Sequence, residues 1–253
     1  YLQTSPEYAM KRLLAAGSGD IFQISKAFRA DELGRRHNPE YTLLEWYRLG
    51  FDHHELLREV AELLSQLLRI NSWEVWPWHA LFENILSINP DQVTEGELAQ
   101  CASSALGQPL PELDRNGVLD LLMSHVIEPA IACRGMVFIV DYPAAQAALA
   151  RCFERDSQSL GARFECYLDG IELANGYWEA GDNRELRHRF EADNGIRRQR
   201  GQQERPVDER FLAAMAAGLP DCAGVALGVD RVLMCQRGLD DLDSILAFSW
   251  SRA

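Results

Sequence analysis

The segment FRADELGRRHNPEYTLLEWYR, residues 28–48, joins two runs that are rich in aromatic and β-branched side chains. One run covers residues 20–29 and the other covers residues 40–49, and glycine, arginine, asparagine and proline separate them. Runs of this composition with such residues between them predict a strand, a long loop and a second strand. The segment therefore indicates a pair of strands joined by a polar loop.

Side chains on the second strand alternate between two faces. Successive strand residues point to opposite sides, so Glu45 shares its face with Tyr41 and Tyr47, while Leu44 and Trp46 point the other way. A single glutamate on a strand most often faces solvent. Two tyrosines on the same face, next to a polar loop, favour instead one face that carries chemistry and one that joins the core.

Capping patterns predict the helices. A hydroxyl followed by proline and glutamate indicates a helix of about three turns within residues 4–17. Residues 52–55 form a capping box for a second, leucine-rich helix. Residues 72–134 have a mainly helical pattern, with another box at residues 94–97 and an end before Pro129. This segment shows no evident chemistry and could form an inserted layer.

A hairpin is predicted for ARFECYLDGIELANGYWEA, because Asp169 and Gly170 form a pair that is typical of a type I′ turn. A two-residue turn at this place would pair Glu165 with Ala174. It would also set Glu165 and Glu172 diagonally on one face of the hairpin. The preceding run GMVFIVDYP is expected to be a buried strand.

The two hairpin carboxylates are candidate metal ligands. Carboxylates this close repel each other unless a cation lies between them, and magnesium commonly joins one or two carboxylates to substrate phosphates. Glu165 and Glu172 therefore predict a magnesium site, although acidic pairs on a surface are common without a metal. Asn175 and Glu179 have the opposite parity to Glu172, and a bulge at Gly176 would restore a common face.

Two arginines are candidate phosphate ligands. Arg29 ends the first predicted strand, and Arg231 follows GVALGVD, where a glycine-broken strand enters a helix. A guanidinium offers a fixed charge, a planar fork that suits phosphate and a flat face that stacks on a base. A lone arginine more often makes a surface ion pair. GVALGVD is neither a dinucleotide fingerprint nor a Walker loop, so a bound nucleotide would need another scaffold.

Composition bounds the class of protein. The chain has 253 residues of which 47% are hydrophobic, enough for one large domain or two small ones. Its net charge of −13 disfavours a broad nucleic-acid-binding surface. The six scattered cysteines predict reduced, buried thiols in the cytoplasm and argue against zinc. No apolar run has the length of a membrane span, no leader precedes Tyr1, and we expect N-terminal residues to be missing.

Three motifs together resemble one family. FRADELGRRHNPEYTLLEWY, GIELANGYWE and GVALGVDR are similar to motifs 2 and 3 of class II aminoacyl-tRNA synthetases of the lysyl branch, over most of the chain. TSPEYAMKRLL and DCAGVALGVDR resemble more closely the paralogues in that branch that modify translation elongation factor P. The resemblance implies one α+β catalytic domain over residues 1–253, an antiparallel sheet flanked by helices, and a homodimer. It places motif 1 upstream of Tyr1.

The resemblance also implies an ATP site with magnesium. Arg29 and Arg231 would be catalytic, with Arg29 at the α-phosphate and Arg231 enclosing the adenine together with Tyr41. The implied ATP-binding residues are Arg29, Asp31, His37, Asn38, Tyr41, Glu172, Leu173, Gly228 and Arg231, and the implied magnesium ligands are Glu165 and Glu172. Asp31 and Tyr41 stand where the family usually has glutamate and phenylalanine, which weakens the assignment of the adenine site.

An amino-acid pocket follows from the same resemblance. Its implied residues are Ser5, Pro6, Glu7, Glu45, Tyr47, Asn175, Glu179 and Ala226. Ser5 and Glu7 would face the amino end of the substrate, and Asn175 its carboxylate. Glu45, Tyr47 and Glu179 would surround the ε-ammonium, which needs such acceptors because a buried, unpaired ammonium is prohibitively unstable.

Ala226 bears on the choice of substrate. It stands where tRNA-charging lysyl enzymes carry glycine, and its methyl group would crowd an α-amino acid. The expected reaction is therefore transfer of (R)-β-lysine, or lysine, to a lysine side chain of elongation factor P. Two alternatives stay open. One is tRNA charging, disfavoured by the negative charge, by Ala226 and by the lack of a recognisable anticodon-binding domain; the other is a non-catalytic sensor, disfavoured by the retained charged residues.

Overall fold

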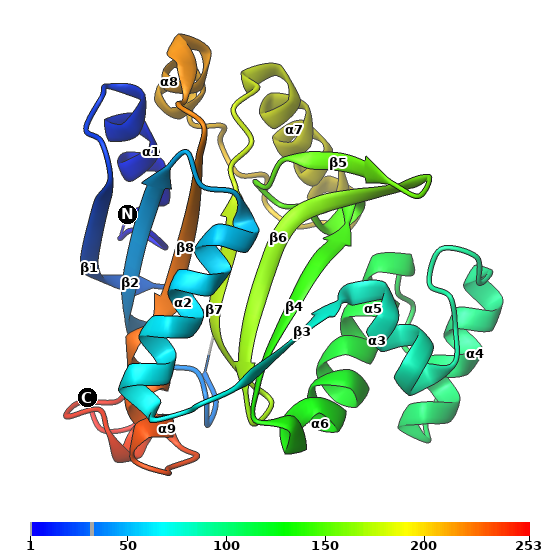
Figure 1. Ribbon diagram of the computed structural model, residues 1–253. Coiled ribbons are helices and arrows are strands. Elements are labelled where there is room, and N and C mark those ends of the chain that lie inside the picture. The colour runs from blue at the N-terminus through cyan, green and yellow to red at the C-terminus, as the bar shows by residue number, and fades with distance from the viewer. Residues whose placement is uncertain (1, 31–32) are drawn as a thin grey trace.

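The computed structural model describes residues 2–30 and 33–253 (Figure 1). One sheet runs in the order β1-β2-β8-β7-β6-β4-β3, and β5 pairs with β6. The strands are β1 Ile21–Phe28, β2 Glu40–Leu49, β3 Trp73–Pro77, β4 Met136–Pro143, β5 Cys152–Arg155, β6 Gln158–Leu168, β7 Ile171–Trp178 and β8 Cys222–Gly228. Every neighbouring pair is antiparallel except β3 with β4. The predicted α+β class and the strand-loop-strand of residues 20–49 are confirmed.

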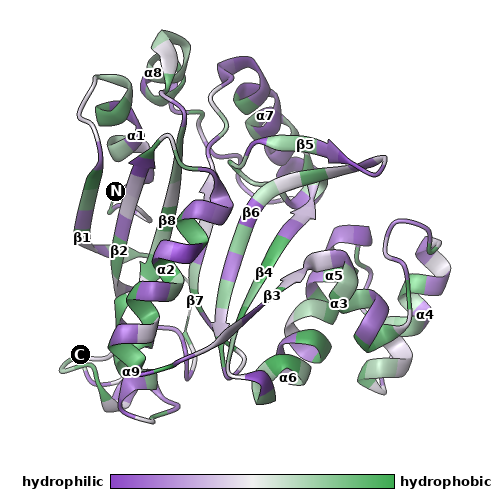
Figure 2. Cartoon of the chain, viewed as in Figure 1, coloured by the Kyte–Doolittle hydropathy of each residue, from purple (hydrophilic) through white to green (hydrophobic). Residues whose placement is uncertain are grey.

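Helices cover the sheet in separate groups (Figure 1). They are α1 Glu7–Ala15, α2 His53–Leu68, α3 Trp78–Leu81, α4 Glu95–Leu106, α5 Arg115–Leu122, α6 Glu128–Ile131, α7 Asn183–Gln199, α8 Glu209–Gly218 and α9 Val229–Gln236. The outer helix α7 is mostly hydrophilic, whereas β4 is hydrophobic over most of its length (Figure 2). Within the described ranges, no helix combines the length and the apolar character that crossing a membrane requires. All six cysteines are free thiols, but the burial that their scattered pattern suggested holds for Cys166 and Cys222 and not for the exposed Cys133.

One face of the sheet forms the main core beneath α2. The Asp52 carboxylate accepts the Glu55 N–H at 2.8 Å, and the Glu55 carboxylate accepts the Asp52 N–H at 3.0 Å, so the predicted capping box begins this helix. Trp46 of β2 points into the core and is 7% exposed. The apolar stripe of α2 packs there against strand residues that include Phe138, Phe164, Val225 and Leu227. This is the apolar face that the alternation in residues 40–49 predicted.

Residues 72–134 differ from the mainly helical expectation at two places. The segment begins with strand β3, which pairs in parallel with β4 at the edge of the sheet. Such a short edge strand leaves little periodic signal. The helical chain also continues through Pro129, because this proline lies in the first turn of α6, where its missing N–H is not needed. The helices then bury Trp78, Phe82 and Leu122 against the second face of the sheet.

The β6–β7 hairpin has the predicted turn and a different register. Asp169 and Gly170 have φ values of 50° and 72°, as a type I′ turn requires. Glu165 lies opposite Asn175, however, and not opposite Ala174 as predicted. The extra residue is Leu173, so the bulge lies closer to the turn than the glycine position that the sequence suggested. Glu165 and Asn175 thereby share one face.

Candidate active site

Polar side chains form rows on the face of the sheet opposite α2. Residues directly opposite each other on antiparallel strands point to the same face. Ala226 lies opposite Glu45 on one side and opposite Asn175 on the other. Asn175 in turn lies opposite Glu165, which completes a row across four strands. A second row, two residues further along, consists of Tyr47, Gly224, Tyr177 and Arg163.

A cavity of about 270 Å³ lies over these rows. The predicted residues that line it are Ser5, Glu7, Arg29, His37, Asn38, Tyr41, Glu45, Tyr47, Glu172, Leu173, Asn175, Glu179, Ala226, Gly228 and Arg231. Pro6 does not line the cavity; it is buried at the N-cap position of α1. Glu165 does not line the cavity either, but it accepts a hydrogen bond at 3.2 Å from Nδ2 of Asn175, which does. Asp31 lies outside the described residues.

Three carboxylates, those of Glu7, Glu45 and Glu179, gather at one end of the cavity. Ser5 Oγ donates to Glu45 Oε1 at 2.8 Å. Lys11 Nζ lies 2.7 Å from Glu7 Oε1 and 2.6 Å from Glu179 Oε2, and the Lys11 and Glu179 side chains are each 1% exposed. A buried set of acids with one internal cation is suited to receive a ligand that carries ammonium groups.

Burial changes the protonation of this end of the cavity. It raises the pKa of Glu45 to about 7, although the Ser5 hydroxyl opposes the shift. It raises the pKa of Glu179 to about 8 against the opposing charge of Lys11. Burial disfavours the charge of Lys11 as well, but Glu179 and Glu7 outweigh it and raise the pKa of the ammonium. Without a second cation, both carboxyls therefore hold a proton part of the time near neutral pH.

Gly224 makes room for this end of the cavity. A Cβ atom at this position would lie 2.2 Å from Tyr47 Cε1 and 2.5 Å from Glu179 Oε1. Contacts this short are not compatible with a side chain, so only glycine allows the tyrosine and the acid to approach β8. Nothing in the sequence distinguishes Gly224 from other strand glycines, because its small size is required only where β2 and β7 flank it.

Two arginines line the other part of the cavity. The Arg29 guanidinium carbon lies 5.3 Å from the centre of the Tyr41 ring. Arg231 Nη1 donates to the Glu172 carbonyl at 2.8 Å and to the Glu172 carboxylate at 3.3 Å, and Arg231 Nη2 lies 2.8 Å from His37 Nε2. Guanidinium N–H groups lie in one plane. These bonds therefore hold Arg231 by its edge, and its flat face is suited to stack on a ring.

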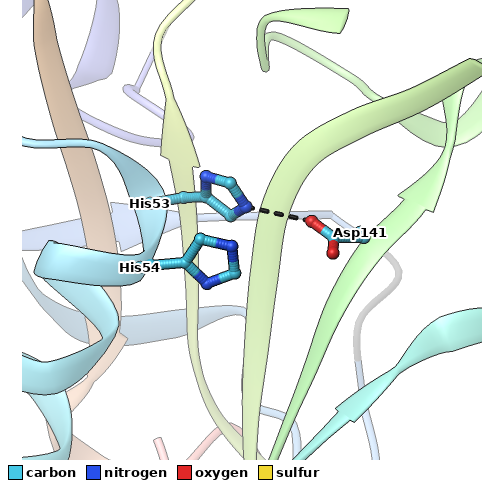
Figure 3. A group of neighbouring side chains, drawn as sticks. All are labelled: His53, His54 and Asp141. Carbon is cyan, nitrogen blue, oxygen red and sulfur yellow. Dashed lines mark hydrogen bonds and ion pairs between the residues drawn. The ribbon is translucent and has the colours of Figure 1, made fainter. Parts of the chain in front are cut away.

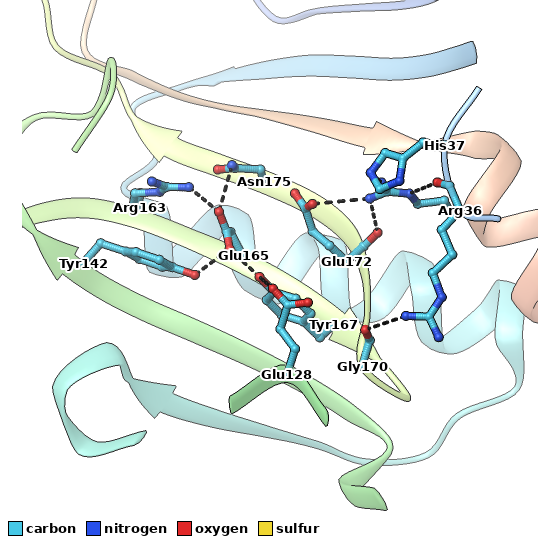
Figure 4. A network of polar contacts seen from close by, with 11 residues as sticks. Arg36, His37, Glu128, Tyr142, Arg163, Glu165, Tyr167, Gly170, Glu172 and Asn175 are labelled. Atoms are coloured by element: carbon cyan, nitrogen blue, oxygen red, sulfur yellow. Dashed lines mark hydrogen bonds and ion pairs between the residues drawn. The ribbon is translucent and has the colours of Figure 1, made fainter. Parts of the chain in front are cut away.

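The two predicted magnesium ligands differ in their surroundings (Figure 4). Glu165 accepts from Asn175 at 3.2 Å, from Tyr142 and Tyr167 at 2.6 Å each, and from Arg163. A carboxylate offers about four lone-pair sites, so Glu165 is saturated. Glu172 faces the cavity with a side chain that is 39% exposed; partial loss of water around its carboxylate, together with the nearby charge of Glu165, raises its pKa. Glu172 fits magnesium as it stands, whereas Glu165 would first have to release a donor.

Sequence reasoning missed a third acid beside this pair. Glu128 of α6 lies 3.5 Å from the Tyr167 hydroxyl, and burial with the charges of Glu165 and Glu172 raises its pKa to about 7. It comes from the helical segment that showed no chemistry in the sequence. Arg36 was missed too, although its loop was singled out, and it donates to the Gly170 carbonyl at 3.2 Å.

His53, His54 and Asp141 form a separate cluster (Figure 3). His53 Nε2 lies 3.0 Å from Asp141 Oδ1, and Arg155 Nη2 lies 2.8 Å from Asp141 Oδ2. The three ligand atoms lie within 4.8 Å of one another, but Arg155 already neutralises the aspartate. We interpret the cluster as a polar contact that fastens α2 to β4.

Comparison with known proteins identifies the family of the chain. The profile of the family described as tRNA synthetases class II (D, K and N) matches residues 1–252. The chain belongs to this family. The chain is also similar to relatives named elongation factor P–(R)-β-lysine ligase. It is 48% identical to the relative from Vibrio cholerae, 46% identical to the one from Vibrio atlanticus and 45% identical to the one from Salmonella paratyphi B. The alignments cover 100% of this chain and 78% or 79% of the relatives. The resemblance to the lysyl branch is confirmed.

Proposed function

We propose that the protein activates (R)-β-lysine, or lysine, with ATP and transfers it to a lysine side chain of translation elongation factor P. The observation that carries the proposal is the polarity of one cavity: Arg29 and Arg231 line it near Tyr41 at the start of β2, and the acids Glu45 and Glu179 line it further along that strand, beside Tyr47. Such a cavity suits a substrate with a phosphate at one end and an ammonium at the other. The names of the relatives support this reading.

The first step forms an acyl-adenylate. An oxygen of the substrate carboxylate attacks the α-phosphorus of ATP, the bond to the bridging oxygen of the β-phosphate breaks, and pyrophosphate leaves. Arg29 and Arg231 would stabilise the negative charge of the phosphoryl group in transit. Glu45 and Glu179 would hold an ammonium and so fix the approach of the carboxylate. Magnesium, when bound, would neutralise phosphate charge, with Glu172 as its direct ligand and Glu165 behind it.

The second step transfers the acyl group. The acceptor lysine amine attacks the activated carbonyl carbon, the bond from that carbon to the AMP oxygen breaks, an amide forms and the amine loses a proton. No covalent enzyme intermediate is needed. Because the proposed acceptor is a translation factor, the reaction would take place in the cytoplasm.

Ala226 supports a β-amino substrate. Its position between Glu45 and Asn175 sets its methyl group in the space between the proposed ammonium and carboxylate subsites. We propose that this methyl crowds an amino group on the α-carbon more than one on the β-carbon. We therefore propose that (R)-β-lysine is preferred over lysine.

A homodimer is part of the proposal. Phe22 and Ile24 of the edge strand β1 are 74% and 62% exposed, an apolar face that a second copy would cover. Analytical ultracentrifugation of the purified chain tests this, and a monomer at micromolar concentration would contradict it.

One set of assays tests the function against its alternatives. ATP–pyrophosphate exchange is measured with lysine and with (R)-β-lysine, and transfer is then measured to elongation factor P and to tRNA. We expect exchange that favours (R)-β-lysine and an added mass on the factor. Charged tRNA with an unmodified factor would indicate a tRNA synthetase, and no exchange with either amino acid would indicate a non-catalytic module.

A further inference from the structure

Lys11 is exceptional among the basic residues of the chain. It and Lys26 are the two lysines among 25 basic residues, and the others are arginines. The Lys26 side chain is 49% exposed and lies 3.3 Å from Glu40, whereas that of Lys11 is 1% exposed. An ammonium is a compact point charge with three donors, while a guanidinium is a wide planar fork. The buried position next to the cavity thus carries the smaller cation.

Lys11 joins two acids from different parts of the fold. Glu7 lies one turn before it on α1, and Glu179 follows the end of β7. Each gives one carboxylate oxygen to Lys11 Nζ. The other oxygen of Glu179, Oε1, lies beside the Cβ position of Gly224, which lines the cavity. Lys11 therefore pairs with one carboxylate oxygen of Glu7 and one of Glu179, and leaves the other oxygen of each acid for a ligand.

The charge of this end of the cavity follows from the same residues. Glu7, Glu45 and Glu179 carry three negative charges when ionised, and Lys11 cancels one, which leaves a net charge of −2. A diamino acid brings two ammonium groups. The remaining charge therefore matches that of a ligand with two amino groups, and exceeds that of a ligand with one.

We propose that Lys11 is a positioning residue that sets the charge of the amino-acid pocket and so makes it select a diamino acid. This inference rests on the proposed function and deepens it. Without Lys11, no ammonium would lie between Glu7 and Glu179, and buried carboxylates that face one another take up protons instead of staying charged. The protonated acids would hold two ammonium groups less firmly.

The test compares three amino acids in ATP–pyrophosphate exchange with the full chain: (R)-β-lysine, 6-aminohexanoic acid, which lacks the β-amino group, and 3-aminohexanoic acid, which lacks the ε-amino group. For Lys11→Met we expect the KM for (R)-β-lysine to rise at least tenfold, with the KM for ATP within twofold and the preference over both analogues reduced. Lys26→Met is the matched control, because it removes the other lysine of the chain from the surface, and it should change none of these values.

A double variant separates charge from folding. Lys11→Met with Glu7→Gln removes both members of an ion pair, leaves two carboxylates and keeps an acceptor oxygen at position 7. Glu7→Gln alone leaves a net charge of −1, whereas the double variant restores −2, so we expect the KM of the double variant for (R)-β-lysine to be at least threefold lower than that of Glu7→Gln. If Lys11→Met does not fold, this comparison decides, and a double variant that binds no better than Glu7→Gln contradicts the inference.

Two outcomes overturn different claims. A folded Lys11→Met with unchanged KM and unchanged preference would refute the role of Lys11 and leave the proposed function intact. A wild-type chain that exchanges with none of the three amino acids would refute the proposed function itself.

Discussion

Glu45 and Asn175 lie in one row across the sheet, two strands apart, with Ala226 directly between them. The three strands fix this spacing through their backbone hydrogen bonds, so the size of the side chain at position 226 determines the space between the acid and the amide. A single methyl group there can change which isomer fits.

Replacement of this methyl tests the preference for the β-isomer. We expect Ala226→Gly to raise kcat/KM for lysine relative to (R)-β-lysine by roughly tenfold, because one methyl in a close-fitting pocket contributes about 1–3 kcal/mol of discrimination. Exchange kinetics with both amino acids measure the ratio. The control is Ala223→Gly, on the same strand but buried in the α2 core, which should lower stability without altering the ratio. An unchanged ratio in Ala226→Gly would show that the methyl does not select the isomer.

Gly224 should tolerate no side chain. Gly224→Ala would bring Cβ to 2.2 Å from Tyr47 and 2.5 Å from Glu179, so either the tyrosine or the acid must move. We expect the KM for the amino acid to rise more than tenfold and the melting temperature to fall. Kinetics and thermal unfolding measure both. Gly96→Ala is the control, because a Cβ there meets nothing within 4 Å in helix α4 and alanine favours helices.

Substrate binding should release protons. Glu45 and Glu179 have pKa values of about 7 and about 8, and a bound ammonium favours their charged forms. Between pH 6 and 8 the amino acid should therefore bind more tightly as the pH rises, and a fraction of a proton or more should leave on binding. Calorimetric titration in two buffers with different ionisation enthalpies counts these protons. A binding enthalpy that is the same in both buffers at pH 7 would be inconsistent with the raised pKa values.

The stability of the free protein should depend on pH through Glu45. Its pKa rises from 4.5 to about 7 on folding, so the folded state binds more protons than the unfolded state between these values. Stability is then highest below pH 4.5 as far as this group is concerned, and is lost as the pH rises towards 7. This contribution of Glu45 to the free energy of unfolding amounts to roughly 3 kcal/mol. Urea unfolding at pH 5 and pH 8 should show a smaller difference for Glu45→Gln than for the wild type.

The two hairpin acids should respond differently to substitution. Glu172→Gln should raise the magnesium concentration at half-maximal exchange at least tenfold with little change in melting temperature. Glu165→Gln should unfold at a markedly lower temperature, because it leaves the Arg163 guanidinium, whose side chain is 11% exposed, without its carboxylate; such a loss costs about 3–5 kcal/mol. Magnesium titrations and thermal unfolding of both variants measure the contrast. Equal magnesium dependence in the two would contradict a leading role for Glu172.

Local signals predicted those parts of the fold that depend on neighbouring residues. The Asp52 capping box, the Asp169–Gly170 turn and the alternation along β2 each report a structure that forms within a few residues. The alternation also predicted that Glu45 and Tyr47 share a face, which is the face that lines the cavity. The site residues on distant strands were predicted from the resemblance of the motifs to a known family.

Non-local packing determined what the sequence did not reveal. Leu173 forms the hairpin bulge because β7 must pair with β6 and β8 together, and a leucine between glutamate and alanine gives no sign of this. Strand β3 exists through its parallel pairing with β4, which lies across the whole helical segment. Glu128 appears as an ordinary helix residue until α6 packs beside Tyr167. In each case the deciding contact lies far along the chain.

The ion pairs of Lys11 determine whether this lysine can itself be acylated. In the proposed reaction, an activated acyl group destined for a lysine of another protein would form beside a lysine of the chain itself. An amine reacts as a nucleophile only after it has lost its proton, and Glu179 and Glu7 raise the pKa of Lys11. We therefore expect no self-acylation at Lys11 when the chain is incubated with ATP and amino acid, and any added mass in a peptide map should lie on exposed Lys26.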